Sequence, residues 1–277
     1  MCPDLQSCGL IRKRTISYLA SSFYLPGYLV KTPKSPLLLA FTLLLLVGFS
    51  SCAGDNHPAE DFEVSGLDVS RYQAIVDWRA VKLSGVDFVF AKATEGGDHR
   101  DPLFGENWQE LREQRIRRGA YHFFRPGISA ELQAMNFIAQ VGDLLPGDLP
   151  PVLDVEDRGG LTHDEFNHRL QSWLDLVEAR YRIKPIIYSG QVFYNRHLAG
   201  RYTDYPVWIA RYKDELPALA DGRNFQFWQY GDTGKVPGIT GPVDLNIFTG
   251  SHLEMVMMSI PANPLVSDPM DPMASNN

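Results

Sequence analysis

Cysteine is scarce in this 277-residue chain and is confined to its beginning. The three cysteines are Cys2, Cys8 and Cys52, and residues 53–277 contain none. Those residues therefore have neither a disulfide framework nor a cysteine-ligated metal site. The sequence also lacks a His, Cys and Asp cluster at metal-ligand spacing and a glycine-rich phosphate loop. We expect no metal and no cofactor, and a fold that rests on an ordinary hydrophobic core.

Basic residues are also few after residue 52. The first 52 residues hold five of the 26 basic residues and one of the 33 acidic residues. This leaves 21 basic and 32 acidic residues, a formal net charge of −11, for residues 53–277. Nucleic-acid binding requires clustered lysine and arginine to neutralise phosphates. The acidic balance therefore argues against nucleic acid as a partner.

A 13-residue apolar run, Leu37–Phe49, is too short to span a bilayer comfortably. Two lysines precede it, as in the apolar part of an export signal. The run leads into Ser50-Ser51-Cys52, which resembles the lipobox of bacterial lipoproteins, although an aliphatic residue is usual where Phe49 stands. We predict an exported protein that is lipid-anchored to the membrane of the bacterial cell envelope at Cys52. The alternatives are a plain secretory signal with Cys52 incidental, and a single uncleaved anchor.

Composition also suggests where the signal, the tether, the folded domain and the tail begin and end. Residues 1–29 fit poorly as the start of a signal, because the segment is long, has a mixed composition and contains Pro3, Asp4 and Pro26. We expect translation to start at Val30, so that residues 30–52 form the lipoprotein-type signal. Residues 53–62 are polar and aperiodic and are predicted to be a tether. Residues 63–255 are predicted to form one folded domain, and residues 256–277 a disordered tail.

Apolar strands alternate with helices along the predicted domain. Strands are expected near residues 64–72, 86–92, 120–124, 151–156, 185–189, 206–210, 225–230 and 243–248. Asp77 is expected to cap a short helix, Thr162 and Glu165 to form a capping box, and Gly119 to end the helix that starts near Phe104. Such alternation favours a buried parallel sheet. The last strands leave little room for helices and look like hairpins, so we expect an irregular α/β, TIM-like barrel.

The segment PVLDVE (151–156) ends an apolar strand in carboxylates. Because side chains alternate along a strand, Asp154 and Glu156 share one face while Val155 points to the other. Two neighbouring carboxylates repel each other, so one should keep its proton at a pH where an isolated Glu is ionised. Glycoside hydrolysis uses such a pair: an acid for the leaving oxygen and a carboxylate for the developing positive charge. A surface strand that simply ends in acidic residues is the alternative.

Seven segments stand in a fixed order: GLDVSRYQ (66–73), DFVFAKATEG (87–96), GAYHFF (119–124), PVLDVE (151–156), PIIYSG (185–190), WIARY (208–212) and FWQY…VPGITGPVDLNIF (227–248). Together they resemble the glycoside hydrolase family 25 lysozymes, the N-acetylmuramidases named for the Chalaropsis-type enzyme. The resemblance covers about residues 64–250. It implies a flattened β/α barrel with fewer than eight helices. It also implies hydrolysis of the β-1,4 bond between N-acetylmuramic acid and N-acetylglucosamine in peptidoglycan, and we expect the protein to act as a monomer.

The resemblance also implies roles for four carboxylates. Glu156 matches the general acid and Asp154 its partner, while Asp68 and Asp244 match the other two carboxylates of the site. Burial and the three neighbouring negative charges would raise the pKa of Glu156. Asp154 would either attack the anomeric carbon or orient the substrate's own N-acetyl group to attack. Both routes retain configuration.

Aromatic and polar residues on the strands are predicted to bind substrate. The predicted set is Tyr121, Tyr188, Trp208, Lys92 and Gln229. Aromatic residues on strands usually belong to the core, but sugar rings stack on such faces, and the family motifs place some of these positions in the glycan groove. Trp228 suits the core and the groove equally. His122 faces away from Tyr121 and is expected to be a core histidine with satisfied hydrogen bonds.

Other interpretations of these residues stay open. Asp68 could cap the element that follows it, and Asp244 could form an ion pair with Lys92 or Arg211. Lys92 could orient a carboxylate rather than contact sugar. At the level of function, the same motifs suit a glycan-binding module without turnover, or a hydrolase of another N-acetylated polysaccharide.

Overall fold

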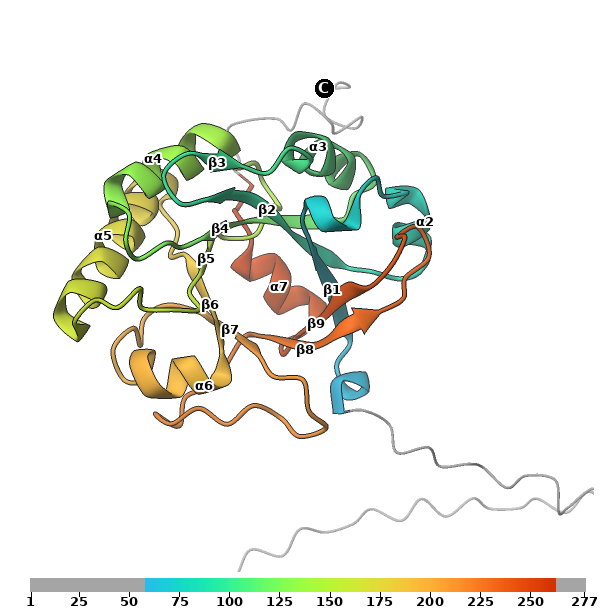
Figure 1. Ribbon diagram of the computed structural model, residues 1–277. Helices are drawn as coiled ribbons and strands as arrows, with labels where there is room; N and C mark the ends of the chain where they lie inside the picture. Colours follow the sequence, from blue (N-terminus) through green and yellow to red (C-terminus); the bar gives the residue numbers. More distant parts are fainter. Residues whose placement is uncertain (1–57, 263–277) are drawn as a thin grey trace, which may run out of the picture. The chain divides into compact units, whose positions relative to one another are not determined.

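Eight strands close into a barrel (Figure 1). The structure is a computed structural model and describes residues 58–262. β1 pairs with both β2 and β9, which completes the ring, and the two-residue strand β3 is added at the end of β2. The strands are β1 (Val64–Val69), β2 (Phe88–Glu95), β3 (His99–Arg100), β4 (Arg117–Phe123), β5 (Val152–Asp154), β6 (Ile186–Gly190), β7 (Val207–Ala210), β8 (Phe227–Gly234) and β9 (Val243–Phe248).

Strand direction divides the barrel into a regular and an irregular part. From β1 to β8, the barrel strands are parallel to their neighbours, whereas β9 is antiparallel to both β8 and β1. The predicted hairpin is therefore confirmed for β8 and β9, which a short connection joins. β6 and β7 run parallel to each other, and β7 runs parallel to β8. One reversed strand is what makes this barrel irregular.

Six α-helices lie within residues 58–262, fewer than eight, as predicted. The cap at Asp77 is confirmed, because its carboxylate accepts the Ala80 N–H at 3.0 Å. The capping box of Thr162 and Glu165 is present as well. The helices are α2 (Trp78–Leu83), α3 (Phe104–Glu113), α4 (Ala130–Val141), α5 (His163–Tyr181), α6 (Gln191–Phe193), which continues as a π-helical turn over Tyr194–Leu198, and α7 (His252–Met258).

Aromatic rings fill the inside of the barrel, and two glycines make room for them. Phe90 stacks on Trp208 at 4.6 Å between ring centroids, and Phe88 lies beside it. A Cβ atom on Gly66 would lie 2.4 Å from the Phe88 ring, and one on Gly119 would lie 2.5 Å from the Phe90 ring. The prediction that Gly119 ends a helix is therefore wrong. α3 ends at Glu113, and Gly119 belongs to β4, where only a residue without a side chain fits.

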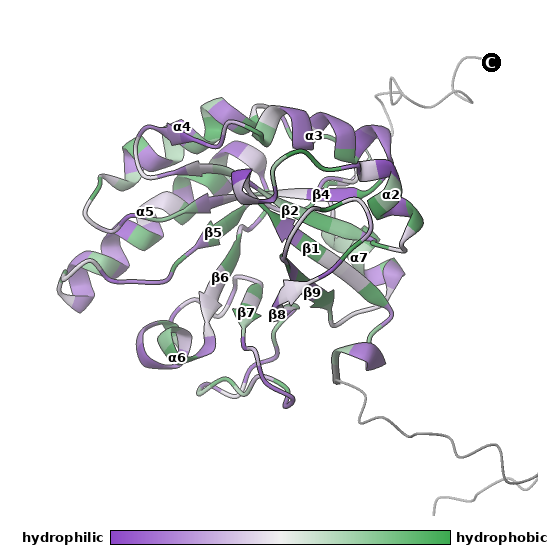
Figure 2. Cartoon of the chain, turned by 45° about the vertical axis from the view of Figure 1, so that its right-hand side comes forward, coloured by the Kyte–Doolittle hydropathy of each residue, from purple (hydrophilic) through white to green (hydrophobic). Residues whose placement is uncertain are grey.

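A second core lies between the barrel and its helices. Figure 2 shows mixed hydrophilic and hydrophobic residues along α4 and α5, whereas β1 and β2 are mainly hydrophobic. His122 is buried in this layer, bonded through its ring nitrogens to Thr94 at 2.7 Å and Gln133 at 3.0 Å, and stacked on Trp173. Burial lowers the pKa of His122 to about 4, so the ring is neutral at pH 7. The prediction of a satisfied core histidine is confirmed.

The folded part extends beyond both predicted boundaries. Within the predicted tether, a 3-10 turn over Pro58–Asp61 buries Ala59. Within the predicted tail, α7 continues to Met258, and the Ile260 N–H donates to the Asp148 carbonyl at 2.8 Å. Composition alone missed these contacts because their partners are distant in sequence. In residues 58–262, no helix is both long and apolar enough to cross a membrane. Residues 1–57, with the predicted start at Val30, the signal and Cys52, and residues 263–277 lie outside the described residues.

Candidate active site

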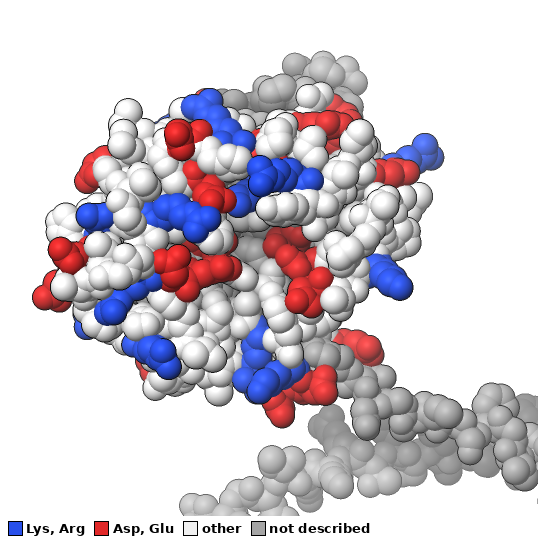
Figure 3. Space-filling model, viewed as in Figure 1, with Lys and Arg blue, Asp and Glu red and all other residues white. Residues whose placement is uncertain are grey.

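The four predicted carboxylates line one cavity of 270 Å³. Asp68 lies in β1 and Asp154 at the end of β5, and Glu156 follows two residues later. Asp244 lies near the start of β9, whose reversed direction brings that end to the same rim as the carboxyl ends of the parallel strands. This is the rim where barrels of this kind carry their sites. Figure 3 shows acidic side chains on both sides of a hollow near the centre of one face.

The end of β5 aims Asp154 and Glu156 into this cavity. The Phe124 N–H donates to the Asp154 carbonyl, and the Val155 N–H to the Tyr188 carbonyl, both at 2.9 Å. These bonds hold the backbone extended past the strand, so Val155 is buried in the outer core while Glu156 stays exposed. Asp154 is only 6% exposed, and its Oδ1 atom has no hydrogen-bond partner among the described residues.

Both carboxyl groups have raised pKa values, for partly different reasons. Burial raises the pKa of Asp154 well above its usual range, and the negative charge of Glu156 adds to this. Glu156 is exposed as a residue, but partial desolvation of its carboxylate still raises its pKa, and the charge of Asp157 adds to the rise. The sequence predicted instead that Asp68, Asp154 and Asp244 would raise the pKa of Glu156. Glu156 lies nearer the outer rim, so its neighbour Asp157 supplies the larger charge effect.

Asp68 is the centre of a buried hydrogen-bond network. Its Oδ2 atom accepts the side-chain amides of Gln229 at 2.7 Å and Asn246 at 2.8 Å. Asn246 in turn accepts the Trp208 indole N–H at 2.8 Å. Gln229 accepts two phenol hydroxyls at 2.7 Å each, from Tyr188 and Tyr212. Asp68 thus fixes the aromatic lining of the cavity through two amides, and it does not cap the turn that follows, where Ser70 is the cap.

Asp68 and Asp244 face each other across the antiparallel pair of β1 and β9 and share a hydrogen bond. Burial and the charge of Asp244 raise the pKa of Asp68 well above its usual range. Burial also raises the pKa of Asp244, although the hydrogen bond from Asp68 opposes the rise. This hydrogen bond raises the pKa of Asp68 and lowers that of Asp244, the directions expected when Asp68 is the donor. The ion pairs considered for Asp244 are not formed: Lys92 pairs with Glu95, and Arg211 with Glu215.

All five predicted substrate-binding residues line this cavity: Tyr121, Tyr188, Trp208, Lys92 and Gln229. Trp208, however, is only 2% exposed and packs against Phe90 and Tyr188, so the protein already covers much of its ring. Lys92 donates to Glu95 at 2.7 Å, and its positive charge lowers the pKa values of Asp154 and Glu156. Lys92 therefore forms an ion pair with one carboxylate and acts through its charge on two others. This is the role that the sequence offered as the alternative to contact with sugar. Trp228 does not line the cavity and is fully buried in the core.

Sequence reasoning missed several residues in or next to this cavity, and three of them bear on the proposed site. Asn246 follows Asp244 by two residues on the same strand face, so alternation could have identified it. Tyr212 lies beyond the end of β7, where no strand periodicity applies. Tyr72 lines the cavity although the residue is 76% exposed, and its place in the GLDVSRYQ motif was the available clue. Within residues 58–262, no group of three or more His, Cys, Asp or Glu residues could hold a metal ion.

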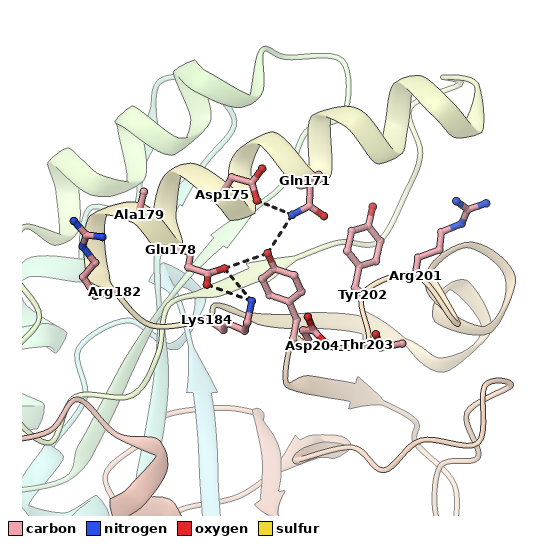
Figure 4. A pocket seen from close by; sticks show the side chains of 11 residues that line it. Gln171, Asp175, Glu178, Ala179, Arg182, Lys184, Arg201, Tyr202, Thr203 and Asp204 are labelled. Carbon is pink, nitrogen blue, oxygen red and sulfur yellow. Dashed lines mark hydrogen bonds and ion pairs between the residues drawn. The ribbon is translucent and has the colours of Figure 1, made fainter.

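Another groove, of 630 Å³, lies between α5 and the connection from β6 to β7 (Figure 4). None of the predicted site residues lines it. Its central polar groups bond to one another: Gln171 donates to the Tyr205 hydroxyl at 3.1 Å, and Tyr205 donates to Glu178 at 3.2 Å. Lys184 forms an ion pair with Glu178. The barrel-rim cavity therefore remains the candidate active site.

Comparisons with known proteins point to one family. The family model for glycosyl hydrolases family 25 matches residues 67–239, a range that includes Asp68, Asp154 and Glu156 but ends before Asp244. The Escherichia coli protein YegX is 47% identical over 199 residues, 70% of this chain and 72% of its own length. Lysozyme M1 of Streptomyces globisporus is 32% identical over 215 residues, 73% of each chain. A family 25 glycosyl hydrolase from Bacillus anthracis has a TM-score of 0.69 at 32% identity, covering 73% of this chain and 95% of that one.

Proposed function

This chain belongs to glycosyl hydrolase family 25 and is a glycoside hydrolase of the lysozyme type, and we propose that Glu156 and Asp154 perform its reaction. The bond cleaved is the β-1,4 link between N-acetylmuramic acid and N-acetylglucosamine in peptidoglycan. One observation carries the proposal: the two carboxyls line the same cavity, and buried Oδ1 of Asp154 has no partner among the described residues. A buried acceptor without a partner is costly, so a bound substrate that donates to it gains affinity.

Glu156 is proposed to protonate the glycosidic oxygen. A general acid must hold its proton at the working pH, and the raised pKa of Glu156 extends the pH range in which it does so. Its exposure at the rim also suits a group that later exchanges its proton with water. The positive charges of Lys92 and Arg125 lower this pKa and so limit the rise.

Asp154 is proposed to stabilise the positive charge that develops at the anomeric carbon. Two routes remain compatible with its position: direct attack by the carboxylate, or acceptance of the N–H of the substrate's acetamido group, whose oxygen then attacks. The buried, unpartnered Oδ1 supports either route, because it is free both to bond to carbon and to accept an amide. Asp68 and Asp244 act as positioning residues, since Asp68 holds Gln229 and Asn246 in place.

The decisive experiment compares wild type with Glu156→Gln on purified peptidoglycan, with mass analysis of the reducing ends. We expect muramic-acid reducing ends from the wild type and a rate lower by roughly 10²- to 10⁴-fold in the variant, the usual effect of losing a general acid. Glu106→Gln is the matched control, because Glu106 is exposed on α3 and lines no part of the cavity.

Three outcomes would contradict parts of the proposal. Equal release by wild type and Glu156→Gln would remove Glu156 from its role. Binding of peptidoglycan with no release by either protein would favour a glycan-binding module. Release of reducing ends other than muramic acid would favour a hydrolase of a different bond or polysaccharide.

Export follows from the substrate, because peptidoglycan lies outside the cytoplasmic membrane. We propose that residues 30–52 direct export and that Cys52 receives a lipid, which would keep the enzyme beside its membrane. Cys52→Ala should then move the protein from the membrane fraction to the soluble fraction. We further propose a monomer, because one chain supplies every site residue described above, and sedimentation can test this.

A further inference from the structure

A second cavity opens beside the catalytic one. It measures 680 Å³, more than twice the 270 Å³ of the catalytic cavity, and Glu156, Tyr188 and Tyr212 line both. Its other walls are the α6 segment (residues 190–193 and 196–197) and the chain at and beyond the end of β7 (residues 210–213). A substrate whose bond lies at Glu156 can therefore extend into this space without leaving the protein surface.

The two cavities differ in charge. The catalytic cavity is lined by Asp68, Asp154, Glu156 and Asp244, with Lys92 as its only Lys or Arg. The second cavity is lined by Arg196, Arg211 and Lys213, and Glu156 is its only acidic residue. We call the second cavity the cationic groove.

Two of these cations are available to a ligand. The Arg211 guanidinium is engaged, because it pairs with Glu215 and donates to Gln191 at 3.3 Å. Arg196 and Lys213 are exposed, and neither has a hydrogen-bond or ion-pair partner in the described part of the chain. Exposed cations that line a groove and are not neutralised by the protein select an anionic group.

We propose that the cationic groove binds the peptide stem of a muramic-acid unit next to the scissile bond, with stem carboxylates at Arg196 and Lys213. This rests on the proposed function, since it concerns the same substrate. The stem begins at the lactyl group of the sugar and carries carboxylates, which the four acidic residues of the catalytic cavity repel. The cationic groove is the adjoining space where those charges find partners. Val192, 74% exposed on the same wall, offers an apolar contact for the small side chains of such a peptide.

The test measures binding of a reaction product, so that it does not depend on turnover. The probes are the disaccharide N-acetylglucosaminyl-N-acetylmuramic acid with its tetrapeptide, and the same disaccharide without peptide, which keeps only the lactyl carboxylate. The proteins are wild type, Arg196→Ala/Lys213→Ala, and the control Arg79→Ala/Lys82→Ala, which removes two exposed cations from α2.

We expect wild type and control to bind the peptide-bearing probe roughly threefold to tenfold more tightly than the peptide-free probe, the size expected for two exposed charge pairs. The Arg196→Ala/Lys213→Ala protein should lose this difference while its affinity for the peptide-free probe stays unchanged. An equal difference in all three proteins, or none in wild type, would overturn the inference. An equal loss of affinity for both probes would also overturn it, because the two cations would then contact the disaccharide that both probes share. Failure to release muramic-acid ends in the digestion assay would count against the proposed function alone.

Discussion

Asp68 is buried, carries a raised pKa and accepts two amide N–H groups on one oxygen. A carboxyl whose pKa is raised on folding stabilises the protein fully below its unfolded pKa, and this contribution is lost as pH rises through the folded value. Asparagine can accept both amides with its oxygen and donate to Asp244 with its nitrogen, as the protonated acid does. The Asp68→Asn protein should therefore lose less stability than wild type as pH rises from about 4, the unfolded pKa of Asp.

Thermal unfolding from pH 4 to pH 8 measures this difference. Asp68→Ala is the informative companion, because it leaves two buried amides without an acceptor, and it should lose about 2 kcal/mol or more at every pH. Parallel melting curves of wild type and Asp68→Asn across this range would mean that Asp68 binds no extra proton in the folded state.

Glu156 provides a second prediction at the scale of single residues, which concerns the pH dependence of activity. It must be protonated to act, so kcat/KM should fall as pH rises through its pKa. Asp157 raises that pKa and Arg125 lowers it. Asp157→Asn should therefore move the alkaline limb of the profile to lower pH, and Arg125→Gln should move it to higher pH. Shifts in the same direction, or no shift in either variant, would exclude Glu156 as the group that controls this limb.

At the scale of single elements, close packing between β4 and its neighbours supports one wall of the catalytic cavity. Gly119 in β4 leaves room for the Phe90 ring, and Phe90 stacks on Trp208, which lines the cavity. Gly119→Ala should cost about 1–3 kcal/mol of unfolding free energy through overpacking, and it should lower activity by displacing Trp208. Gly105→Ala on α3 is the matched control, because nothing lies within 4 Å of its added Cβ.

Urea unfolding distinguishes the two glycine variants. The control should be neutral or stabilised by about 0.5–1 kcal/mol, because alanine favours a helix more than glycine does. If Gly119→Ala behaved like Gly105→Ala, the close contact with Phe90 would not be a real constraint on the barrel.

At the scale of elements, the sequence predicted what periodicity and local capping determine. The strand that ends in Asp154 and the capping box at Thr162 depend on neighbours within a few residues, and both are present. Asn246 was missed because its role arises only when β9 pairs with β1 and brings it to Asp68. The helix α7 was missed for the same reason. Its buried Met255 belongs to one hydrophobic cluster with residues of distant strands, among them Val64 and Phe88.

At the scale of the whole molecule, charge should control how the enzyme meets its substrate. Residues 53–277 carry a formal net charge of −11, and peptidoglycan with its stem carboxylates is anionic as well. Repulsion between like charges slows association and is screened by salt, with a Debye length of about 30 Å at 0.01 M and about 8 Å at 0.15 M. We therefore expect kcat/KM on peptidoglycan strands to rise a few-fold between these two ionic strengths.

Glu106→Gln/Glu113→Gln should show a weaker rise, because it removes two exposed negative charges on α3 while the cavity stays intact. A decrease of kcat/KM with ionic strength would be equally informative. A rate that falls as salt rises would mean that local attraction at Arg196 and Lys213 outweighs the repulsion of the whole domain. In that case Arg196→Ala/Lys213→Ala should restore the rise, because only the net negative field would then remain to be screened.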